Sequence, residues 1–144
     1  MKRHPALQPL SDDHHGALVL ARRLRRSGLE AARTDVERVD PDSLARETRL
    51  RFAEELEPHF RVEEAHLLPL LARRGEADLA ARADADHARL RELVAGPWTQ
   101  DTAREVGTLL EQHVRFEERV MFPALERMLD EAELARVREV VAWR

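Results

Sequence analysis

The feature of the sequence that most limits its possible folds is a six-residue motif that occurs twice. The segment His59–Glu64 (HFRVEE) returns as His113–Glu118 (HVRFEE), so both copies read His-x-Arg-x-Glu-Glu. On an α-helix, positions i and i+4 lie on one face about one turn apart, so the first His and Glu of each copy can point at one place. The motif therefore predicts two helices, each presenting an imidazole and a carboxylate together.

The similarity between the two copies continues beyond the motif. Leu68–Leu71 (LPLL) follows the first copy at the same distance as Phe122–Leu125 (FPAL) follows the second. A single His-x-x-x-Glu motif could equally be an ion pair on an ordinary exposed helix. Two copies with matching flanks favour an internal repeat that builds a metal site.

The composition is typical of a single helical domain. The 144 residues can close one core, so we expect one domain over residues 1–144. Leu, Ala, Glu and Arg dominate and only 5 residues are Gly, which predicts an all-α protein. Because the chain has no Cys, a metal ion would need nitrogen and oxygen ligands, which favours iron, manganese or zinc over an iron–sulfur cluster.

The charge pattern excludes several classes of partner. The net charge is −4, with acidic and basic residues interspersed, so we expect neither nucleic acid nor an anionic membrane as a partner. No apolar run approaches the roughly 20 residues of a membrane span, and residues 1–5 lack the apolar segment of a secretory signal. We therefore expect a cytoplasmic protein, with the choice between monomer and homodimer, and any redox partner, left open.

The sequence contains no recognisable hydrolytic machinery. It has no nucleophile elbow, no phosphate-binding glycine loop and no Ser/His/Asp arrangement, so no catalytic residue and no organic cofactor site are predicted. Whether the protein is an enzyme stays open at this stage.

Apolar periodicity predicts five helices. Their expected ranges are about 11–28, 40–73, 77–94, 99–129 and 131–143. Ser11, Asp40 or Ser43, Thr99 or Asp101, and Asp130 are the candidate N-caps. Residues 30 to 40 fit either a continuing helix or a packed loop.

Prolines and tryptophans add two further expectations. Pro58 and Pro69 fall inside the second helix, where each removes a backbone donor and can kink it, and Pro123 repeats the second of these positions. Trp98 is expected to anchor the connection near residue 97, and Trp143 to anchor the last helix.

A count of helical rise tests whether candidate ligands from different helices could meet. In an up-down-up-down arrangement, each residue rises about 1.5 Å, so ligands on neighbouring helices must lie equally far from their shared turn. Glu63 and His87 lie about equally far from the turn near Gly75, and His87 and His113 match more loosely across the turn near Gly96. Four histidines and two glutamates can then form the ligand set of two divalent ions, with the glutamates bridging. These six residues are His14, His59, Glu63, His87, His113 and Glu117.

Two further histidines are alternative or additional ligands. Helical phase places His14 in the apolar stripe of its helix, about 100° from His15, yet an ungapped match of residues 12–18 with 84–90 aligns His15 with His87. His66 follows Glu63 with the Glu-x-x-His spacing of di-iron carboxylate bundles, although a role at the rim is simpler. Glu64 and Glu118 point about 100° away from their ligand neighbours and are expected in solvent or in supporting roles.

With these motifs and their flanking Pro segments, the chain resembles the hemerythrin-like family, also called HHE cation-binding domains, over about residues 10–129. The resemblance implies an antiparallel up-down-up-down four-helix bundle, here followed by a short fifth helix at the C-terminal end. It also implies a non-haem, carboxylate-bridged centre of two iron ions that binds or reacts with O₂, nitric oxide or peroxide. The six residues above inherit the ligand roles by motif match.

One departure from the family pattern limits the functional prediction. Oxygen-carrying hemerythrins have two histidines four apart on the third helix, but Ala83 stands four residues before His87. One imidazole is therefore missing, and His15 or His66 would have to replace it. The alternatives to small-molecule binding are an iron-handling or peroxide-consuming di-iron enzyme and a metal-free helical interaction module.

Overall fold

The computed structural model describes residues 2–30 and 40–144, and within these ranges all regular structure is helical. This confirms the predicted all-α class. The first long segment is α1 (Gln8–Glu30), and the second runs without a break through α2 (Pro41–Arg51), η1 (Phe52–Leu56), α3 (Glu57–Val62), η2 (Glu63–Leu67) and α4 (Leu68–Arg73). They are followed by α5 (Ala77–Ala95), by a segment comprising α6 (Gln100–Phe116), η3 (Glu117–Met121) and α7 (Phe122–Met128), and by α8 (Glu131–Val141).

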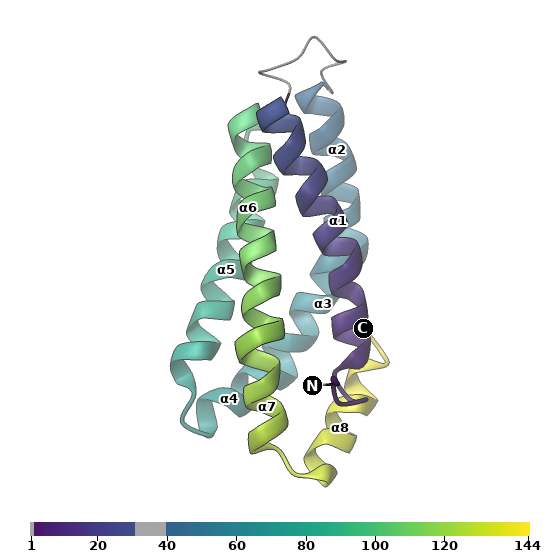
Figure 1. Ribbon diagram of the computed structural model, residues 1–144, viewed down its shortest axis with the longest axis vertical. Coiled ribbons are helices and arrows are strands. Elements are labelled where there is room, and N and C mark those ends of the chain that lie inside the picture. Colours follow the sequence, from purple (N-terminus) through teal and green to yellow (C-terminus); the bar gives the residue numbers. More distant parts are fainter. Residues whose placement is uncertain (1, 31–39) are drawn as a thin grey trace.

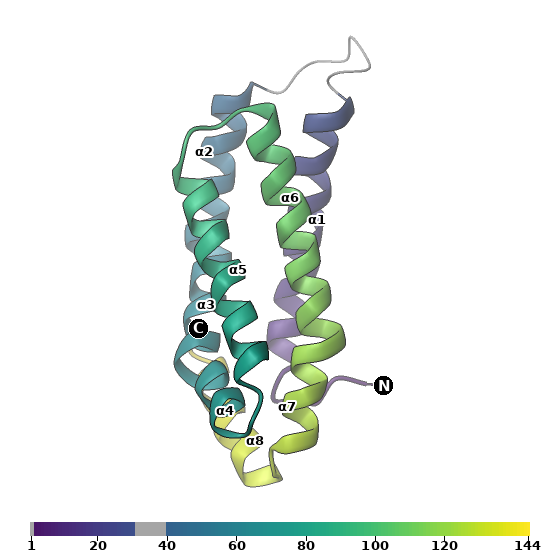
Figure 2. The same ribbon diagram turned by 90° about the vertical axis from the view of Figure 1, so that its left-hand side faces the viewer.

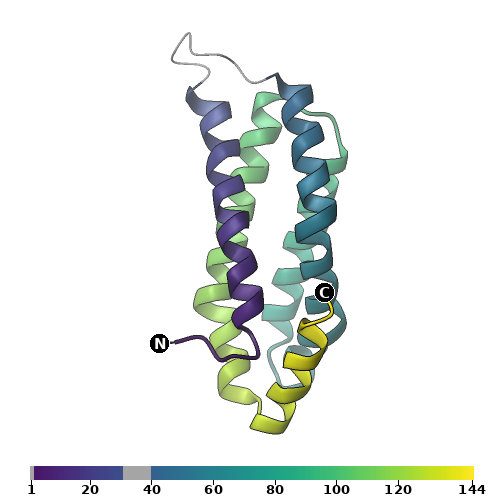
Figure 3. The same ribbon diagram turned by 90° about the vertical axis from the view of Figure 1, so that its right-hand side faces the viewer.

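The long segments lie side by side along the long axis of the molecule (Figure 1). The views turned by 90° show α1 beside α6 and α5 beside the α2–α4 segment (Figures 2 and 3). The short α8 lies at the lower end of the molecule, near α4 and α7 in Figure 2. Short connections at residues 74–76 and 96–99 bring α4, α5 and α6 next to one another.

Most helix starts lie where the capping residues predicted them. Asp40 accepts a hydrogen bond from the Asp42 backbone N–H, and Thr99 and Asp130 each form a capping box. The predicted cap at Ser11 is wrong, because α1 begins at Gln8. Pro9 occupies its first turn, where the missing N–H is not needed. The expectation for residues 30 to 40 concerns a stretch that lies almost wholly outside the described residues.

Three prolines in the interior of the long segments each follow a wide, π-helical turn. The turns are η1, η2 and η3, and each ends two residues before Pro58, Pro69 or Pro123. In each, a backbone N–H bonds to the carbonyl five residues earlier, as from Leu68 to Glu63 and from Phe122 to Glu117. The wider turn makes room for the proline ring, which would otherwise press on the preceding turn. Two of these turns begin at Glu63 and Glu117, the glutamates of the repeated motif.

The apolar core consists of two clusters. One gathers the lower ends of the long segments with α8, and includes Leu10, Leu67 and Phe122. The other fills the upper half, and includes Leu20 and Leu110. Along each long segment the buried histidines and glutamates fall between these two clusters. A polar layer is therefore enclosed by apolar packing above and below.

Helices α1 and α6 are in close contact at Gly107. A Cβ atom on this residue would lie 2.6 Å from the Ala21 carbonyl oxygen, far inside normal contact, whereas one on Gly16 would have no neighbour nearer than 3.7 Å. Gly107→Ala should therefore lower the free energy of unfolding by about 1–3 kcal/mol, because the helices must move apart. Gly16→Ala, the control in a helix interior, should be neutral or stabilising by about 0.5–1 kcal/mol. Chemical denaturation measures both, and equal stability of the two variants would contradict the close approach.

Helix α8 docks through its apolar side. Leu134, Val137 and Val141 are buried, as the periodicity predicted. The expectation for Trp143 is wrong, since its side chain is 86% exposed. The helix ends at Val141, and Arg144 rather than Trp143 contacts the rest of the molecule. Trp98 does pack on the upper cluster, and its indole N–H donates to the Val94 carbonyl. None of the described helices combines the length and apolar composition that a membrane crossing requires.

Candidate metal centre

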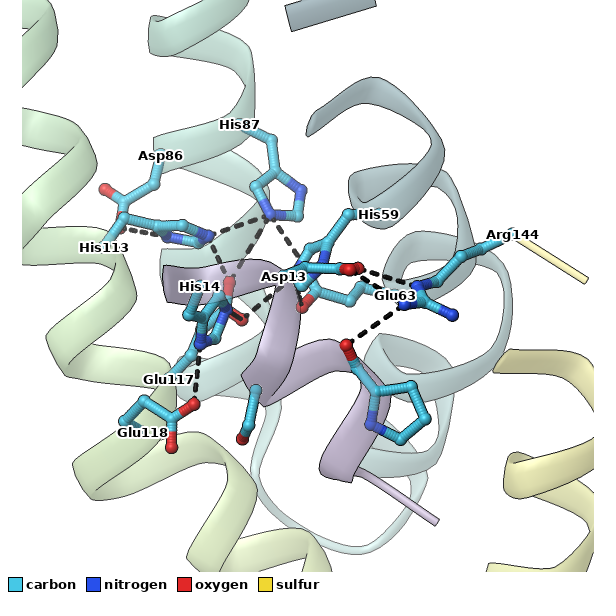
Figure 4. Close-up of polar contacts among 12 residues, drawn as sticks. Asp13, His14, His59, Glu63, Asp86, His87, His113, Glu117, Glu118 and Arg144 are labelled. Atoms are coloured by element: carbon cyan, nitrogen blue, oxygen red, sulfur yellow. Dashed lines mark hydrogen bonds and ion pairs between the residues drawn. The ribbon is translucent and has the colours of Figure 1, made fainter. Parts of the chain in front are cut away.

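The six residues predicted as ligands meet in the polar layer between the two apolar clusters. Helices α1, α3, α5 and α6 each supply one imidazole, and η2 and η3 each supply one carboxylate. None of the six is more than 5% exposed. Figure 4 shows these side chains pointing toward one another from segments far apart in the sequence. The residues are His14, His59, Glu63, His87, His113 and Glu117.

The cluster divides into two groups that share both glutamates. In each group the potential ligand atoms lie within 4.8 Å of one another. One group adds His14 and His59 to Glu63 and Glu117, and the other adds His87 and His113 to the same pair. Two ions could therefore each take two imidazoles while Glu63 and Glu117 bridge them.

All four imidazoles turn Nε2 toward the centre. His14 Nε2 lies 3.1 Å from Glu117 Oε2, and His59 Nε2 lies 2.8 Å from Glu63 Oε1. On the other side, His87 Nε2 lies 3.2 Å from Glu63 Oε2, and His113 Nε2 contacts Glu117 Oε1. Nitrogen and oxygen lone pairs thus converge on one small volume.

Three glutamate oxygens in this volume have no hydrogen-bond partner. Both carboxylate oxygens of Glu63 and Oε1 of Glu117 are buried without one. His59 Nε2 is close enough to Glu63 Oε1 to bond, but the contact is out of line for its ring N–H. Buried carboxylates without partners are strongly unfavourable unless a cation compensates them. The donor set therefore fits divalent metal ions.

The buried imidazoles and Glu117 shift one another's pKa values. Burial lowers the pKa of His87, but the nearby carboxylates of Glu117 and Glu63 outweigh it and raise this pKa to about 9. Burial also lowers the pKa of His113, but the charge of Glu117 and a hydrogen bond to Asp86 outweigh it and raise this pKa to about 10. The pKa of Glu117 lies well below its usual range, because the charge of His113 outweighs burial. Bound cations would compete with protons for the same imidazole nitrogens.

Each imidazole is held from outside by a second carboxylate. Glu118 Oε1 lies 2.7 Å from Nδ1 of His14, and Glu64 Oε2 lies 2.9 Å from Nδ1 of His87. With Nδ1–H donating to these carboxylates, Nε2 keeps its lone pair for the centre. Glu64 and Glu118 therefore support the imidazoles from outside the inner cluster.

Two aspartates complete this outer set, and the sequence analysis missed both. Asp13 Oδ2 lies 3.0 Å from Nδ1 of His59, and Asp86 Oδ2 lies 3.0 Å from Nδ1 of His113. The available signal was the Asp-His dipeptide, which occurs at residues 13–14 and 86–87. Aligning the two dipeptides pairs His14 with His87, whereas the earlier match of residues 12–18 with 84–90 paired His15 with His87.

The four outer contacts form a closed circuit around the centre. Asp13 of α1 holds the imidazole of α3, and Glu64 of η2 holds that of α5. Asp86 of α5 holds the imidazole of α6, and Glu118 of η3 returns to that of α1. Every long segment thus orients a histidine of the next, so the ring orientations depend on all the segments together.

The alternative ligands lie away from the cluster. His15 is exposed on α1, whereas His14 is buried, as its helical phase predicted. His66 is exposed and lines a cleft of about 320 Å³ beside α8. Ala83 is fully buried in the lower apolar cluster, so no third imidazole reaches the His87 and His113 group from that position.

Comparison with known proteins agrees with this geometry. A family model described as "Hemerythrin HHE cation binding domain" matches residues 6–96. That stretch contains His14, His59, Glu63 and His87, while His113 and Glu117 lie beyond it and join the site through the structure. Among curated proteins, no match was found.

Proposed function

Because the chain belongs to the hemerythrin HHE cation-binding domain family, we propose that its buried cluster holds two iron ions and binds O₂ there. The ligands would be the six residues of the cluster, with Glu63 and Glu117 bridging the ions. Nitric oxide and peroxide are related molecules that could occupy the same place, and manganese or zinc could replace iron.

We also propose that the long segments form one domain with the antiparallel up-down-up-down bundle of the family, with α8 as an added fifth helix. Support comes from the short connections at residues 74–76 and 96–99, which suit neighbouring helices that reverse direction. The level at which the four imidazoles meet agrees with the same topology.

The observation that carries the metal proposal is the pair of donor groups that share two buried glutamates. Four imidazole nitrogens and the glutamate oxygens converge, and three of those oxygens have no other partner. An interaction module without metal would have no reason to bury such a set, because each unpaired carboxylate is costly in an apolar interior.

The chain's own residues would keep the centre dry and its ligands fixed. Phe60 stacks on the His87 ring at 3.9 Å between centroids, and Phe122 stacks on His14 at 5.4 Å. With the apolar clusters above and below, these rings keep water from the reactive side of the imidazoles. The chemistry that two ferrous ions would supply is electron donation to a bound diatomic molecule.

The donor set suggests a centre with free coordination positions at both ions. Each group offers two imidazoles and shares two carboxylates. The third long helix supplies one imidazole, whereas that of the family's oxygen carriers supplies two. Octahedral iron would keep positions for exogenous ligands at both ions. Small-molecule binding is therefore supported more directly than reversible oxygen carriage.

Exposure of the anaerobic ferrous protein to O₂ tests this proposal. The expected result is a visible absorption band that appears with O₂ and is lost when O₂ is removed under argon. Glu117→Gln is the control, because loss of a shared carboxylate should abolish the band. Irreversible oxidation followed by catalytic consumption of added peroxide would contradict the binding function and assign the centre to a peroxide-consuming enzyme. The Glu63-x-x-His66 spacing gives that enzyme no support, since His66 is exposed outside the cluster.

A further inference from the structure

The two metal positions have the same set of inner ligands, so any difference in their metal affinity must come from the residues that surround those ligands. Each position has two imidazoles and shares Glu63 and Glu117. We call the position beside His14 and His59 the first position, and that beside His87 and His113 the second. The support of each imidazole is the outer carboxylate that binds its Nδ1, together with the groups paired to that carboxylate.

The supports of His14 and His87 are closely similar. Behind His14, Glu118 is paired with Arg3, whose guanidinium lies 5.3 Å from the centroid of the stacked Phe122 ring. Behind His87, Glu64 is paired with Arg91 in the same way, 5.8 Å from the stacked ring on that side. Both arginines also bind a second glutamate outside the centre, and these two glutamates are Glu126 and Glu57. These two supports therefore give the positions no strong preference.

The supports of His59 and His113 differ. Arg144 binds both oxygens of Asp13, with Nε 2.7 Å from Oδ2 and Nη2 2.8 Å from Oδ1. The Oδ2 atom is the one that accepts from His59 Nδ1 at 3.0 Å (Figure 4). Asp86, which holds His113, has no lysine or arginine partner among residues 2–30 and 40–144.

We propose that Arg144 makes the two metal positions unequal by weakening metal binding at the first position, beside His14 and His59. The inference rests on the proposed metal binding and adds a role for Arg144. Arg144 contacts none of the six candidate ligands, so it would act through Asp13 as a positioning residue.

Two physical effects give this proposal its direction. A carboxylate oxygen that already accepts from a guanidinium is a weaker acceptor for the His59 N–H, so this imidazole donates less electron density through Nε2. The guanidinium also brings a positive charge toward the first position, where it opposes a divalent cation. At the second position, Asp86 keeps its full charge for His113. Both effects favour the second position for the first ion bound.

Removal of Arg144 should have the opposite effect on metal affinity if this residue only holds Asp13 in place. In that case its loss would let Asp13 move, leave the His59 ring less well oriented and weaken metal binding. Tighter metal binding without Arg144 would therefore support the proposal, and weaker binding would indicate a purely structural role.

Stepwise binding of Co(II) to the full-length, metal-free protein tests the inference, with a competing chelator and visible absorption as readout. Two cations that share carboxylates repel each other, so unequal steps in the wild type decide nothing alone. Arg144→Gln should tighten the weaker step, by up to about tenfold, and leave the tighter step unchanged. Arg144→Lys keeps the charge and should stay close to wild type. Arg138→Gln, at an exposed arginine of the preceding helix α8 without a side-chain partner among the described residues, is the matched control and should change neither step.

The aspartates provide a test that does not disturb α8. Asp86→Asn should weaken the tighter step by about 10–100-fold, while Asp13→Asn should have the smaller effect and act on the weaker step. Weaker binding in Arg144→Gln, no change in either step, or equal effects of the two aspartate variants would overturn the inference. Failure of the wild type to bind two Co(II) ions would instead contradict the proposed function.

Discussion

Replacement of Glu117 by glutamine should remove both metal ions, whereas replacement of His59 by alanine should remove only one. Glu117 belongs to both donor groups, so its lost charge affects both positions. His59 belongs to the first group alone. Metal analysis after anaerobic loading with Fe(II) should therefore give about two ions per chain in the wild type, about one in His59→Ala and fewer than one in Glu117→Gln.

Glu105→Gln provides the matched control for this comparison. Glu105 lies on α6 as an exposed side chain that pairs only with Arg89 among the described residues, far from the centre. It carries the same chemical change as Glu117→Gln and should retain both ions. Equal metal content in all four proteins would refute the ligand assignment, and equal loss in His59→Ala and Glu117→Gln would refute the shared role of Glu117.

Anaerobic Fe(II) should raise the melting temperature of the metal-free protein by about 15–30 °C when both sites are filled. Binding to the folded state alone stabilises it by about 4 kcal/mol per site at a thousandfold excess over the dissociation constant, and about 1 kcal/mol shifts the melting temperature of a chain this size by roughly 2–4 °C. Glu63 and Glu117 lose an unfavourable buried state when a cation binds, which is the physical source of this gain. Thermal melts followed by circular dichroism at matched pH measure the shift.

The same melt with Glu117→Gln shows whether the stabilisation arises at the cluster. This variant should respond to Fe(II) far less than the wild type, although its metal-free form should be folded. Its metal-free melting temperature should fall, because His113 and His14 lose their buried partner, so the shift caused by Fe(II) is the quantity compared. A wild-type melting temperature indifferent to Fe(II) would favour a helical interaction module without metal.

The sequence predicted the parts of the site that depend on local periodicity. The i,i+4 spacing on a helix requires His59 and Glu63 to share a face, and His113 and Glu117 to do the same. Counting helical rise then predicted that histidines from other helices reach the same level. The structure places all of these side chains in one buried layer.

The outer carboxylates could not be predicted in the same way, because they depend on how neighbouring helices are rotated. Asp13 lies about 100° around the helix from His14, a direction that suggests solvent in an isolated helix. In the folded chain another segment occupies that direction, and the imidazole of its His59 hydrogen-bonds to the Asp13 carboxylate. The contact is thus a property of packing between segments.

Two other features depended on choices that local patterns leave open. A proline inside a helix can produce a kink or follow a wide turn, and only the folded chain shows the wide turns at Glu63 and Glu117. An aromatic residue near a helix end was expected to anchor it, but α8 ends at Val141 and leaves Trp143 in solvent. Its neighbour Arg144 reaches Asp13 because opposite charges, rather than apolar burial, decide that contact.

Anomalous scattering from crystals of the iron-loaded protein, recorded at the iron absorption edge, tests the central claim most directly. The account predicts two anomalous peaks in the layer between the apolar clusters, both beside Glu63 and Glu117. One should lie against His14 and His59, and the other against His87 and His113. A peak outside this layer, or the absence of any peak from protein loaded with iron, would contradict the assignment of these residues as a two-metal centre.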